Sequence, residues 1–454
     1  MGAAPTSVSC GAAVPALPGA SVPSVCDGRV KPVLYHKDVV ARLWLMALVS
    51  APLSAQAPMT IREVVAEALA RNLSLAARRF DITIAEARLL QARLRPNPRL
   101  NVENNFLDVL GAGFGSGDGA AGPAETTSVL HWEVETAGKR RLRTEAARQA
   151  AAGAREGFLE ARRLLILDVQ NAFLDLVLAK ENARTLREIL ATFENLVKIN
   201  RTRYEAGEIA RVELLRSEVA ALQFRNALRR AELRVRQEAV RLQWLMGRPA
   251  PAADFDVSAE LRRDEPIGGV EELVAAALAA RPDLAALRRE RERLDAELRL
   301  QRALALPNVD FGFAHHKQYV GPLPGQTAGF RFEIPLPLLN RNQGEIERAR
   351  QEREQAAARL RALEQQIRAE AVAAWEQHLT ARELLRTIEN EMMGQAVRVR
   401  DTIEFSYRRG EASFIDLLDA QRTLSETMQA YNEARVEYAR TLYLLDAIAA
   451  REAP

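Results

Sequence analysis

The sequence predicts a mainly helical protein that carries a small β part and is built from two copies of one unit. Three observations lead to this prediction: two proline-free stretches of about 68 residues, several short segments of alternating apolar and polar residues, and motifs that recur in both halves. Of the 454 residues, 48% are hydrophobic and 27% charged, with a net charge of +3. This composition excludes a disordered chain, and the even mixing of basic and acidic residues argues against a nucleic-acid binder.

Residues 1–57 are interpreted as a removable prefix. Within them, residues 42–57 (RLWLMALVSAPLSAQA) have the basic start, apolar centre and small-residue end of an export signal. Cleavage after Ala55 is an alternative to cleavage after Ala57, and a short buried helix is the other interpretation of this stretch. The part before the signal is rich in Pro, Gly, Ala and Ser, which suggests a start site assigned too early. Both cysteines of the chain lie in that part, so thiol chemistry is not expected in the exported protein.

The remaining chain repeats itself. The first copy is assigned to residues 58–250 and the second to residues 266–454, with residues 251–265 as a linker. Two motifs, Pro-Asn and Tyr-x-x-Gly-Glu, recur in the same order and begin at Pro96 and Pro307, and at Tyr204 and Tyr407. Generic similarity between Ala-, Leu- and Arg-rich helices does not produce such motifs, so an internal duplication is predicted.

Each copy is predicted to contain the same elements in the same order. A helix of about 35 residues ends at a proline, two short strands follow, and a very long helix then pairs with another through a glycine turn. The proline-free stretches 136–204 and 340–407 are the very long helices. At 1.5 Å per residue, about 68 residues form a rod of roughly 100 Å, far longer than a helix of a compact enzyme. The hairpins turn at Gly207 and Gly410, because glycine permits a left-handed backbone.

The four short segments are predicted to be strands with one apolar and one polar face. Their apolar members are Leu100, Val102 and Phe106; Leu130, Trp132 and Val134; Val309, Phe311 and Phe313; and Phe330, Phe332 and Ile334. Such strands fit a transmembrane barrel, or alternatively a half-buried soluble sheet. No run of 18 or more apolar residues occurs, so no helix is expected to cross a membrane. Four strands cannot close a barrel, so membrane strands would require several chains; a trimer supplies twelve.

With these features the sequence resembles the TolC family of outer-membrane channels, and within it the CzcC-like branch of heavy-metal efflux systems. The resemblance covers residues 58–450 and rests on Glu135–Arg140 (ETAGKR), on Ile334–Gly344 (IPLPLLNRNQG) and on the two Tyr-x-x-Gly turns. It implies a homotrimer with a helical α-barrel in the periplasm and a twelve-stranded β-barrel in the outer-membrane lipid of a Gram-negative bacterium. It also implies a periplasmic adaptor and a proton-driven inner-membrane RND pump as partners.

The resemblance places a periplasmic gate beside the second glycine turn. Asp416 and Asp419 fall on aspartates that ring the entrance in the family, and their spacing puts both on one helix face. Rings of carboxylates attract cations. The alternative is that both are solvated charges, favoured near a helix start by the helix dipole. Tyr407 matches a family tyrosine that holds the entrance shut, but Ala412 occupies the position of its usual basic partner.

The first copy has Glu213 and Arg216 where the second has the two aspartates, so its ring would be nearly neutral. The turns themselves are expected to contact the adaptor. The predicted contact residues are Tyr204, Gly207, Glu208, Gly410 and Glu411. Simple helix capping is the alternative explanation of these turns, and both roles can hold together.

The sequence shows no nucleophile–base spacing, phosphate-binding loop or cluster of metal ligands, so neither enzyme activity, a cofactor nor a metal site is predicted. The adjacent His315 and His316 would point to opposite faces of a strand and cannot chelate from one side. The predicted function is the outer-membrane exit duct of a tripartite efflux system that exports heavy-metal cations. The alternatives are a duct for drugs or secreted proteins and, in another class, a periplasmic coiled-coil structural or adaptor protein.

Overall fold

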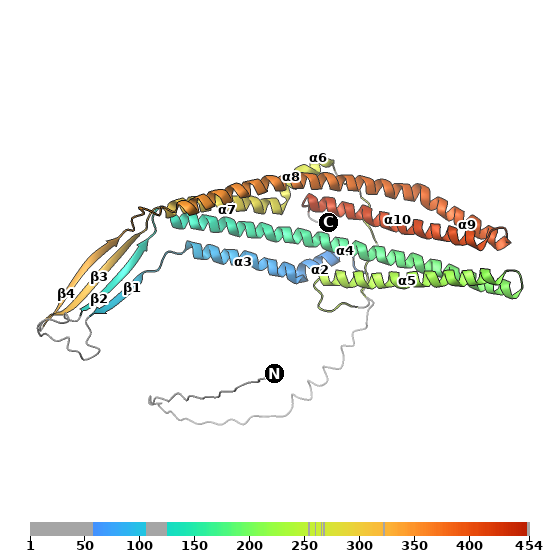
Figure 1. Cartoon of the computed structure of the whole chain (residues 1–454), viewed down its shortest axis with the longest axis horizontal. Helices are drawn as coiled ribbons and strands as arrows, with labels where there is room; N and C mark the ends of the chain where they lie inside the picture. Colours follow the sequence, from blue (N-terminus) through green and yellow to red (C-terminus); the bar gives the residue numbers. More distant parts are fainter. Residues whose placement is uncertain are drawn as a thin grey trace, which may run out of the picture. The chain divides into compact units, whose positions relative to one another are not determined.

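The computed structural model describes residues 58–105, 125–252, 255–258, 260–264, 266, 268–320 and 323–451, all within the unit of residues 56–454. Within this unit, long helices run side by side and four strands lie together at one end of them (Figure 1). The predicted class, mainly helical with a small β part, is therefore confirmed. The predicted export signal and its prefix, residues 1–57, and Phe106 of the first predicted strand lie outside the described residues.

The two halves of the unit contain corresponding elements in the same order. The elements of the first half are α2 (Ile61–Arg71), α3 (Leu73–Arg93), β1 (Arg99–Asn105), β2 (Glu125–Val134), α4 (Lys139–Glu205) and α5 (Arg211–Leu245). Those of the second half are α6 (Val270–Ala280), α7 (Pro282–Leu304), β3 (Val309–Val320), β4 (Leu323–Glu333), α8 (Gln343–Thr387), the π-helical turn η1 (Ile388–Met392), α9 (Met393–Arg409) and α10 (Phe414–Ile448).

The prediction of a single helix before the strands is wrong in both halves, because each half has two helices there. Asn72 separates α2 from α3: its side chain accepts a hydrogen bond from the Leu75 N–H (2.9 Å) and donates one to the Leu245 carbonyl (2.8 Å). In the second half, Pro282 is the first residue of α7. The residue before a proline disfavours the helical backbone, so Arg281 is extended and α6 ends there.

The long helix of the first half is continuous, as predicted. Helix α4 has 67 residues and begins after Gly138, whose φ of +68° is left-handed. Its counterpart in the second half is interrupted, so the prediction of one regular helix over 340–407 is wrong at η1. There the hydrogen bonds widen by one residue for a single π turn. The chain stays helical through this turn because the stretch has no proline to end it.

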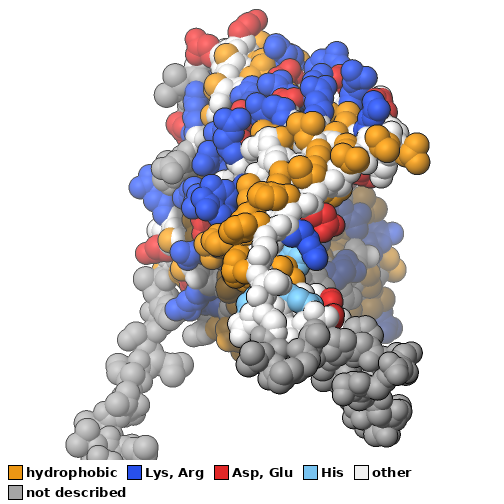
Figure 2. Space-filling model, turned by 90° about the vertical axis from the view of Figure 1, so that its left-hand side faces the viewer, with side chains coloured by type: hydrophobic (Ala, Val, Ile, Leu, Met, Phe, Trp, Pro, Cys, Tyr) orange, Lys and Arg blue, Asp and Glu red, His pale blue; other side chains and the backbone are white. Residues whose placement is uncertain are grey.

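The strands form one antiparallel sheet in the order β1-β2-β3-β4. The central pair joins the two halves, with Trp132 opposite Phe311 and Leu130 opposite Phe313. Residues directly opposite each other share a face, so the register defines two faces. One face carries the exposed apolar side chains, and there the ring of Phe311 contacts the rings of Phe330 and Phe332. Figure 2 shows hydrophobic side chains gathered in a band over this end of the molecule.

The other face of the sheet is polar. His131 Nδ1 lies 2.8 Å from Asp310 Oδ1, and Arg99 donates to the second oxygen of the same carboxylate (3.4 Å). Farther along, the Thr127 hydroxyl lies 2.9 Å from His316 Nδ1. The predicted alternation of apolar and polar residues therefore corresponds to two chemically distinct faces.

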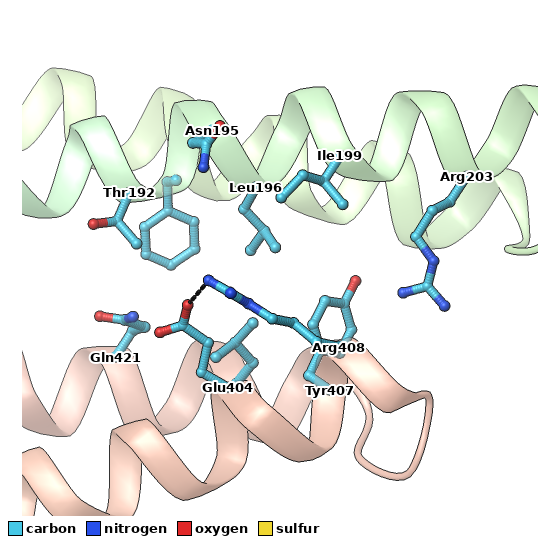
Figure 3. Close-up of a pocket in the computed structure, with 11 residues that line it drawn as sticks. Thr192, Asn195, Leu196, Ile199, Arg203, Glu404, Tyr407, Arg408 and Gln421 are labelled. Atoms are coloured by element: carbon cyan, nitrogen blue, oxygen red, sulfur yellow. Dashed lines mark hydrogen bonds and ion pairs between the residues drawn. The ribbon is translucent and has the colours of Figure 1, made fainter.

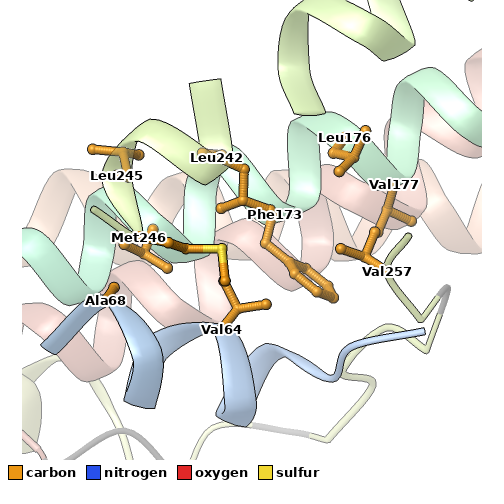
Figure 4. Packing of buried hydrophobic residues seen from close by; sticks show 11 residues of the cluster. Val64, Ala68, Phe173, Leu176, Val177, Leu242, Leu245, Met246 and Val257 are labelled. Atoms are coloured by element: carbon orange, nitrogen blue, oxygen red, sulfur yellow. The ribbon is translucent and has the colours of Figure 1, made fainter. Parts of the chain in front are cut away.

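Helix α4 is the centre of the helical part and contacts α2, α3, α5, α7 and α10. One buried cluster lies where α2, α4 and α5 meet, with Phe173 of α4 between Val64 and Leu242 (Figure 4). The linker adds Val257 to this cluster, and Met59 forms a parallel bridge beside it, with backbone hydrogen bonds to Asp256 and Ser258. Each large apolar side chain buried here stabilises the fold by about 1.5–3 kcal/mol. Among the described helices, none has a segment long and apolar enough to cross a membrane.

Candidate functional site: the tips of the helix hairpins

The α4–α5 and α9–α10 hairpins end in the same turn. Gly207 and Gly410 have φ values of +79° and +81°. The N–H of Glu208 bonds to the Arg203 carbonyl (2.8 Å), and that of Glu411 bonds to the Ser406 carbonyl (2.9 Å). The glycine N–H groups bond to the carbonyls of Tyr204 (2.9 Å) and Tyr407 (3.0 Å), so both turns are Schellman caps, in which the left-handed residue is usually glycine.

Helix capping thus accounts for the two glycines but not for the side chains around them. Tyr204 is 39% exposed, and Glu208 and Glu411 are exposed at the outer edge of their turns. The caps themselves are made by backbone groups, and Glu208 adds an ion pair with Arg203 across its turn (3.3 Å). The exposed side chains can still meet another protein, and their adaptor contact stays a prediction.

Tyr407 connects the two hairpins. Its side chain is only 3% exposed, and its hydroxyl lies 2.8 Å from Asn200 Oδ1 and 3.0 Å from Glu213 Oε1. Asn200 belongs to α4 and Glu213 to α5, whereas Tyr407 belongs to α9. The aromatic ring packs edge-on against Phe414, with 6.2 Å between centroids. Position 412, where a basic partner of Tyr407 was expected, is an alanine. Tyr407 instead contacts an amide and a carboxylate of the other hairpin.

The surroundings of Tyr407 keep its hydroxyl protonated. Burial raises the pKa of Tyr407 to about 12, and the negative charge of Glu213 and its hydrogen bond add to this effect. The hydroxyl is consequently a neutral donor throughout the physiological pH range. Hydrogen bonds to a charged group are worth about 1.5–3 kcal/mol, more than bonds between neutral groups.

Asn200 and Glu213 are the functional residues that sequence reasoning missed. Glu213 was expected to contribute only a charge to the entrance, and Asn200 was not singled out. Asn200 is fully buried on α4, seven residues after Phe193, which is buried on the same side of the helix. A polar residue at an apolar helical position was the available signal.

Asp416 and Asp419 both lie exposed on the first turns of α10. Asp416 closes a capping box: it accepts a hydrogen bond from the Ser413 N–H (3.0 Å), and its own N–H donates to Ser413 Oγ (3.2 Å). The Ser413 hydroxyl also donates to the Asp416 carboxylate (2.7 Å), and this bond, with the weaker effect of the Ser413 N–H, holds the pKa of Asp416 below its usual range. Within the described residues, Asp419 has neither a hydrogen bond nor an ion pair. The capping interpretation thus accounts for Asp416 and leaves Asp419 unexplained, and the gate role of both stays a prediction.

A cavity of about 320 Å³ lies between the two hairpins beside Tyr407 (Figure 3). Its apolar wall comes from α4, through Phe193, Leu196 and Ile199. Its polar wall includes the ion pair between Glu404 and Arg408 of α9 (2.5 Å). The hairpins are therefore not tightly packed here, and the Tyr407 bonds lie at the edge of this gap.

The described residues contain no group of three or more His, Cys, Asp or Glu side chains arranged to hold a metal ion. His315 and His316 lie on opposite faces of β3, as their adjacent positions require. His378 is buried on α8, where its Nδ1 lies 3.0 Å from the Thr441 hydroxyl.

Solved structures of outer-membrane channels have the same fold. A structure of CusC matches with a TM-score of 0.72 and 17% identity, covering 86% of this chain and 91% of that one. VceC of Vibrio cholerae matches with a TM-score of 0.70 and 18% identity, covering 86% of this chain and 95% of that one.

Sequence relatives span nearly the same length. The cobalt-zinc-cadmium resistance protein CzcC of Cupriavidus metallidurans is 23% identical over 383 residues, which covers 84% of this chain and 87% of that protein. The probable outer membrane lipoprotein SilC of Salmonella typhimurium is 22% identical over 391 residues, with 81% of each chain covered. The family model described as "Outer membrane efflux protein" matches residues 64–248 and 273–451. This chain belongs to the outer membrane efflux protein family.

Proposed function

We propose that this protein is the outer-membrane exit duct of a tripartite efflux system that exports heavy-metal cations. Family membership supports a channel, and CzcC, named for cobalt, zinc and cadmium resistance, supports the metal class. The duct itself carries out no chemistry, and a proton-driven inner-membrane pump supplies the energy. A periplasmic adaptor joins the two, with the hairpin turns at Tyr204 and Glu411 as its contacts.

The observation that carries the proposal is the division of the sheet into an apolar and an acidic face. On the polar face, the described strands place five carboxylates and two arginines: Glu103, Glu125, Glu133, Asp310 and Glu333, with Arg99 and Arg331. A wall of this charge attracts cations when it surrounds a water-filled pore. The apolar face suits contact with lipid.

The sheet has two open edges, at β1 and β4. Unpaired edge strands are not viable in lipid, so the proposal requires the β4 edge of one copy to pair with the β1 edge of the next. Three copies of the four-stranded sheet give a closed barrel of twelve strands. In the same homotrimer, the aspartates of α10 would meet at the narrow periplasmic end as the gate.

Fractionation of cells tests this assembly. We expect the full chain in the outer-membrane fraction as a heat-sensitive trimer, running as a monomer only after boiling. A soluble periplasmic monomer would instead support the adaptor alternative. Tolerance assays on a deletion strain, metal by metal, then test the cargo: sensitivity to drugs alone, with normal metal tolerance, would favour the drug duct.

A further inference from the structure

A cavity of about 700 Å³ lies where the sheet meets the helices of the first half. The end of α3 and the following link, the last residues of β2 and the first turns of α4 form its walls. It is separate from the cavity between the hairpin tips and lies at the opposite end of α4. Among its lining side chains are Arg93, Arg95, Arg140, Arg141 and Trp132.

The lining of this cavity has a net positive charge, with five arginines against three glutamates. Its arginines at 93, 95, 140 and 141 have no hydrogen bond or ion pair from their side chains within the described residues, and all four are exposed. The acidic residues in the lining are already engaged. Glu135 pairs with Arg143 (2.6 Å), Glu145 with Arg148 (2.6 Å), and Glu133 accepts a hydrogen bond from Asn308 (2.6 Å).

The same cavity has an apolar side. Trp132 and Val134 belong to the apolar face of the sheet and are 50% and 52% exposed. Tryptophan with both an apolar and a wet side is enriched where a membrane meets water. In Figure 2, Lys and Arg side chains gather beside the hydrophobic band. A ligand that fits this cavity therefore combines an anionic group with an apolar chain.

The corresponding place in the second half has a different chemistry. The Pro-Asn repeat sets Leu304 and Leu306 where the first half has Arg93 and Arg95. Asn342 precedes α8 as Gly138 precedes α4, so the two helix starts can be aligned. In this alignment Gly344 and Glu345 correspond to Arg140 and Arg141. The basic cavity is thus a property of the first half alone and gives one site per chain.

We propose that this cavity binds the phosphate of an anionic glycerophospholipid, with the acyl chains lying along Trp132 and Val134. Guanidinium groups bind phosphate oxygens in a bidentate manner, and they retain their charge at every relevant pH. This inference rests on the proposed function, because it requires the apolar face of the sheet to lie in the membrane. The site would fix the height of each chain at the periplasmic boundary of the bilayer.

The test compares the full-length trimer with the double variant Arg140→Gln, Arg141→Gln. The matched control is Arg361→Gln, Arg368→Gln, which removes two exposed arginines of α8 that also have no described partner. Each trimer is placed in nanodiscs of phosphatidylethanolamine alone or with phosphatidylglycerol, and retained lipids are counted by native mass spectrometry. We expect one phosphatidylglycerol per chain in the wild type and control, and about tenfold less retention in the site variant.

Two outcomes would overturn the lipid site. One is equal phosphatidylglycerol retention by all three proteins, as expected if a neighbouring chain fills the cavity. The other is thermal stabilisation by inorganic phosphate as large as that by phosphatidylglycerol, which would identify a free anion as the ligand. Conductance in bilayers of phosphatidylethanolamine distinguishes failure of the lipid site from failure of the proposed function. A wild-type trimer that conducts but shows no lipid preference refutes only the lipid site.

Discussion

The hydroxyl of Tyr407 lies 3.0 Å from the carboxylate of Glu213, although 194 residues separate them along the chain. Tyr407 belongs to the second hairpin, while its two hydrogen-bond partners, Glu213 and Asn200, belong to the first. This connection lies beside a cavity between the hairpins, which also pack against each other through buried side chains such as Phe193 and Leu417. We infer that breaking it favours an open entrance.

Replacement of Tyr407 by Phe removes the hydroxyl and leaves the packing of the ring in place. The loss of a hydrogen bond to a carboxylate weakens the closed state by about 1.5–3 kcal/mol. The open-to-closed ratio should then rise roughly 10- to 100-fold, since each 1.4 kcal/mol is tenfold. Single-channel recording in planar bilayers measures this ratio directly.

The matched control is Tyr431→Phe. The Tyr431 hydroxyl also bonds to a carboxylate, that of Glu389 (3.1 Å), but both residues belong to the second hairpin. Its loss should leave the open probability unchanged. Equal effects of the two substitutions would show that the connection between hairpins has no special role.

Alkaline pH provides a second test of the same connection. Because the pKa of Tyr407 is raised to about 12, its stabilising bond is fully present below the ordinary tyrosine value of about 10 and is lost as the pH rises through 12. Conductance should therefore increase between pH 10 and 12. Glu213→Gln removes the negative charge and should move this rise toward pH 10, and an unmoved transition would contradict the assignment.

The two aspartates of α10 are expected to govern cation entry. Asp416→Asn with Asp419→Asn removes both charges while an amide oxygen can still accept the bond from Ser413. Reversal potentials under a salt gradient should show reduced cation selectivity, and block by divalent cations should weaken. Selectivity that is indistinguishable from the wild type would remove the aspartates from the gate.

Acid provides a complementary measurement on the same residues. The pKa of Asp416 is lowered by its bonds to Ser413, so its charge is present above the usual range and is lost only as the pH falls below it. Selectivity contributed by Asp416 should persist to a lower pH than an ordinary aspartate allows. Ser413→Ala removes the side-chain bond and should shift the loss of selectivity to higher pH.

Two left-handed glycines should respond differently to the same substitution. Gly410→Ala introduces backbone strain of about 1 kcal/mol but no clash, because open space surrounds the added Cβ. At Gly247 (φ +76°) the Cβ would lie 2.4 Å from the Arg71 carbonyl oxygen, at the α2–α3 junction. Thermal unfolding should show a much larger loss for Gly247→Ala, and equal losses would contradict this packing.

Sequence periodicity predicted the elements whose pattern is local. The absence of proline predicted the 67-residue helix α4, and the alternation of apolar and polar residues predicted β2. Each of these signals is contained within its own element. The break at Asn72 depends on a hydrogen bond to Leu245, far away in sequence, so helical periodicity did not reveal it. The π turn that begins at Ile388 likewise contains no proline or glycine that would have predicted it from the sequence.

The candidate site was predicted in part for the same reason. The turn glycines could be located because their signal is a short motif in one segment, and the aspartates of α10 because a family resemblance covers that segment. The partners of Tyr407 come from two other helices, and only the packing of these helices identifies Asn200 and Glu213 as those partners. The alanine at position 412 indicated that the usual bond of Tyr407 is either replaced or absent, and it did not show which residues would replace it.

The central claim is that copies of this chain enclose a cation-conducting pore. The most direct measurement is the reversal potential of the purified full-length trimer in a planar bilayer under a potassium chloride gradient. The acidic face of the sheet and the aspartates of α10 predict discrete channels with a cation-selective reversal potential. A protein that yields no channels, or channels selective for chloride, would contradict the account.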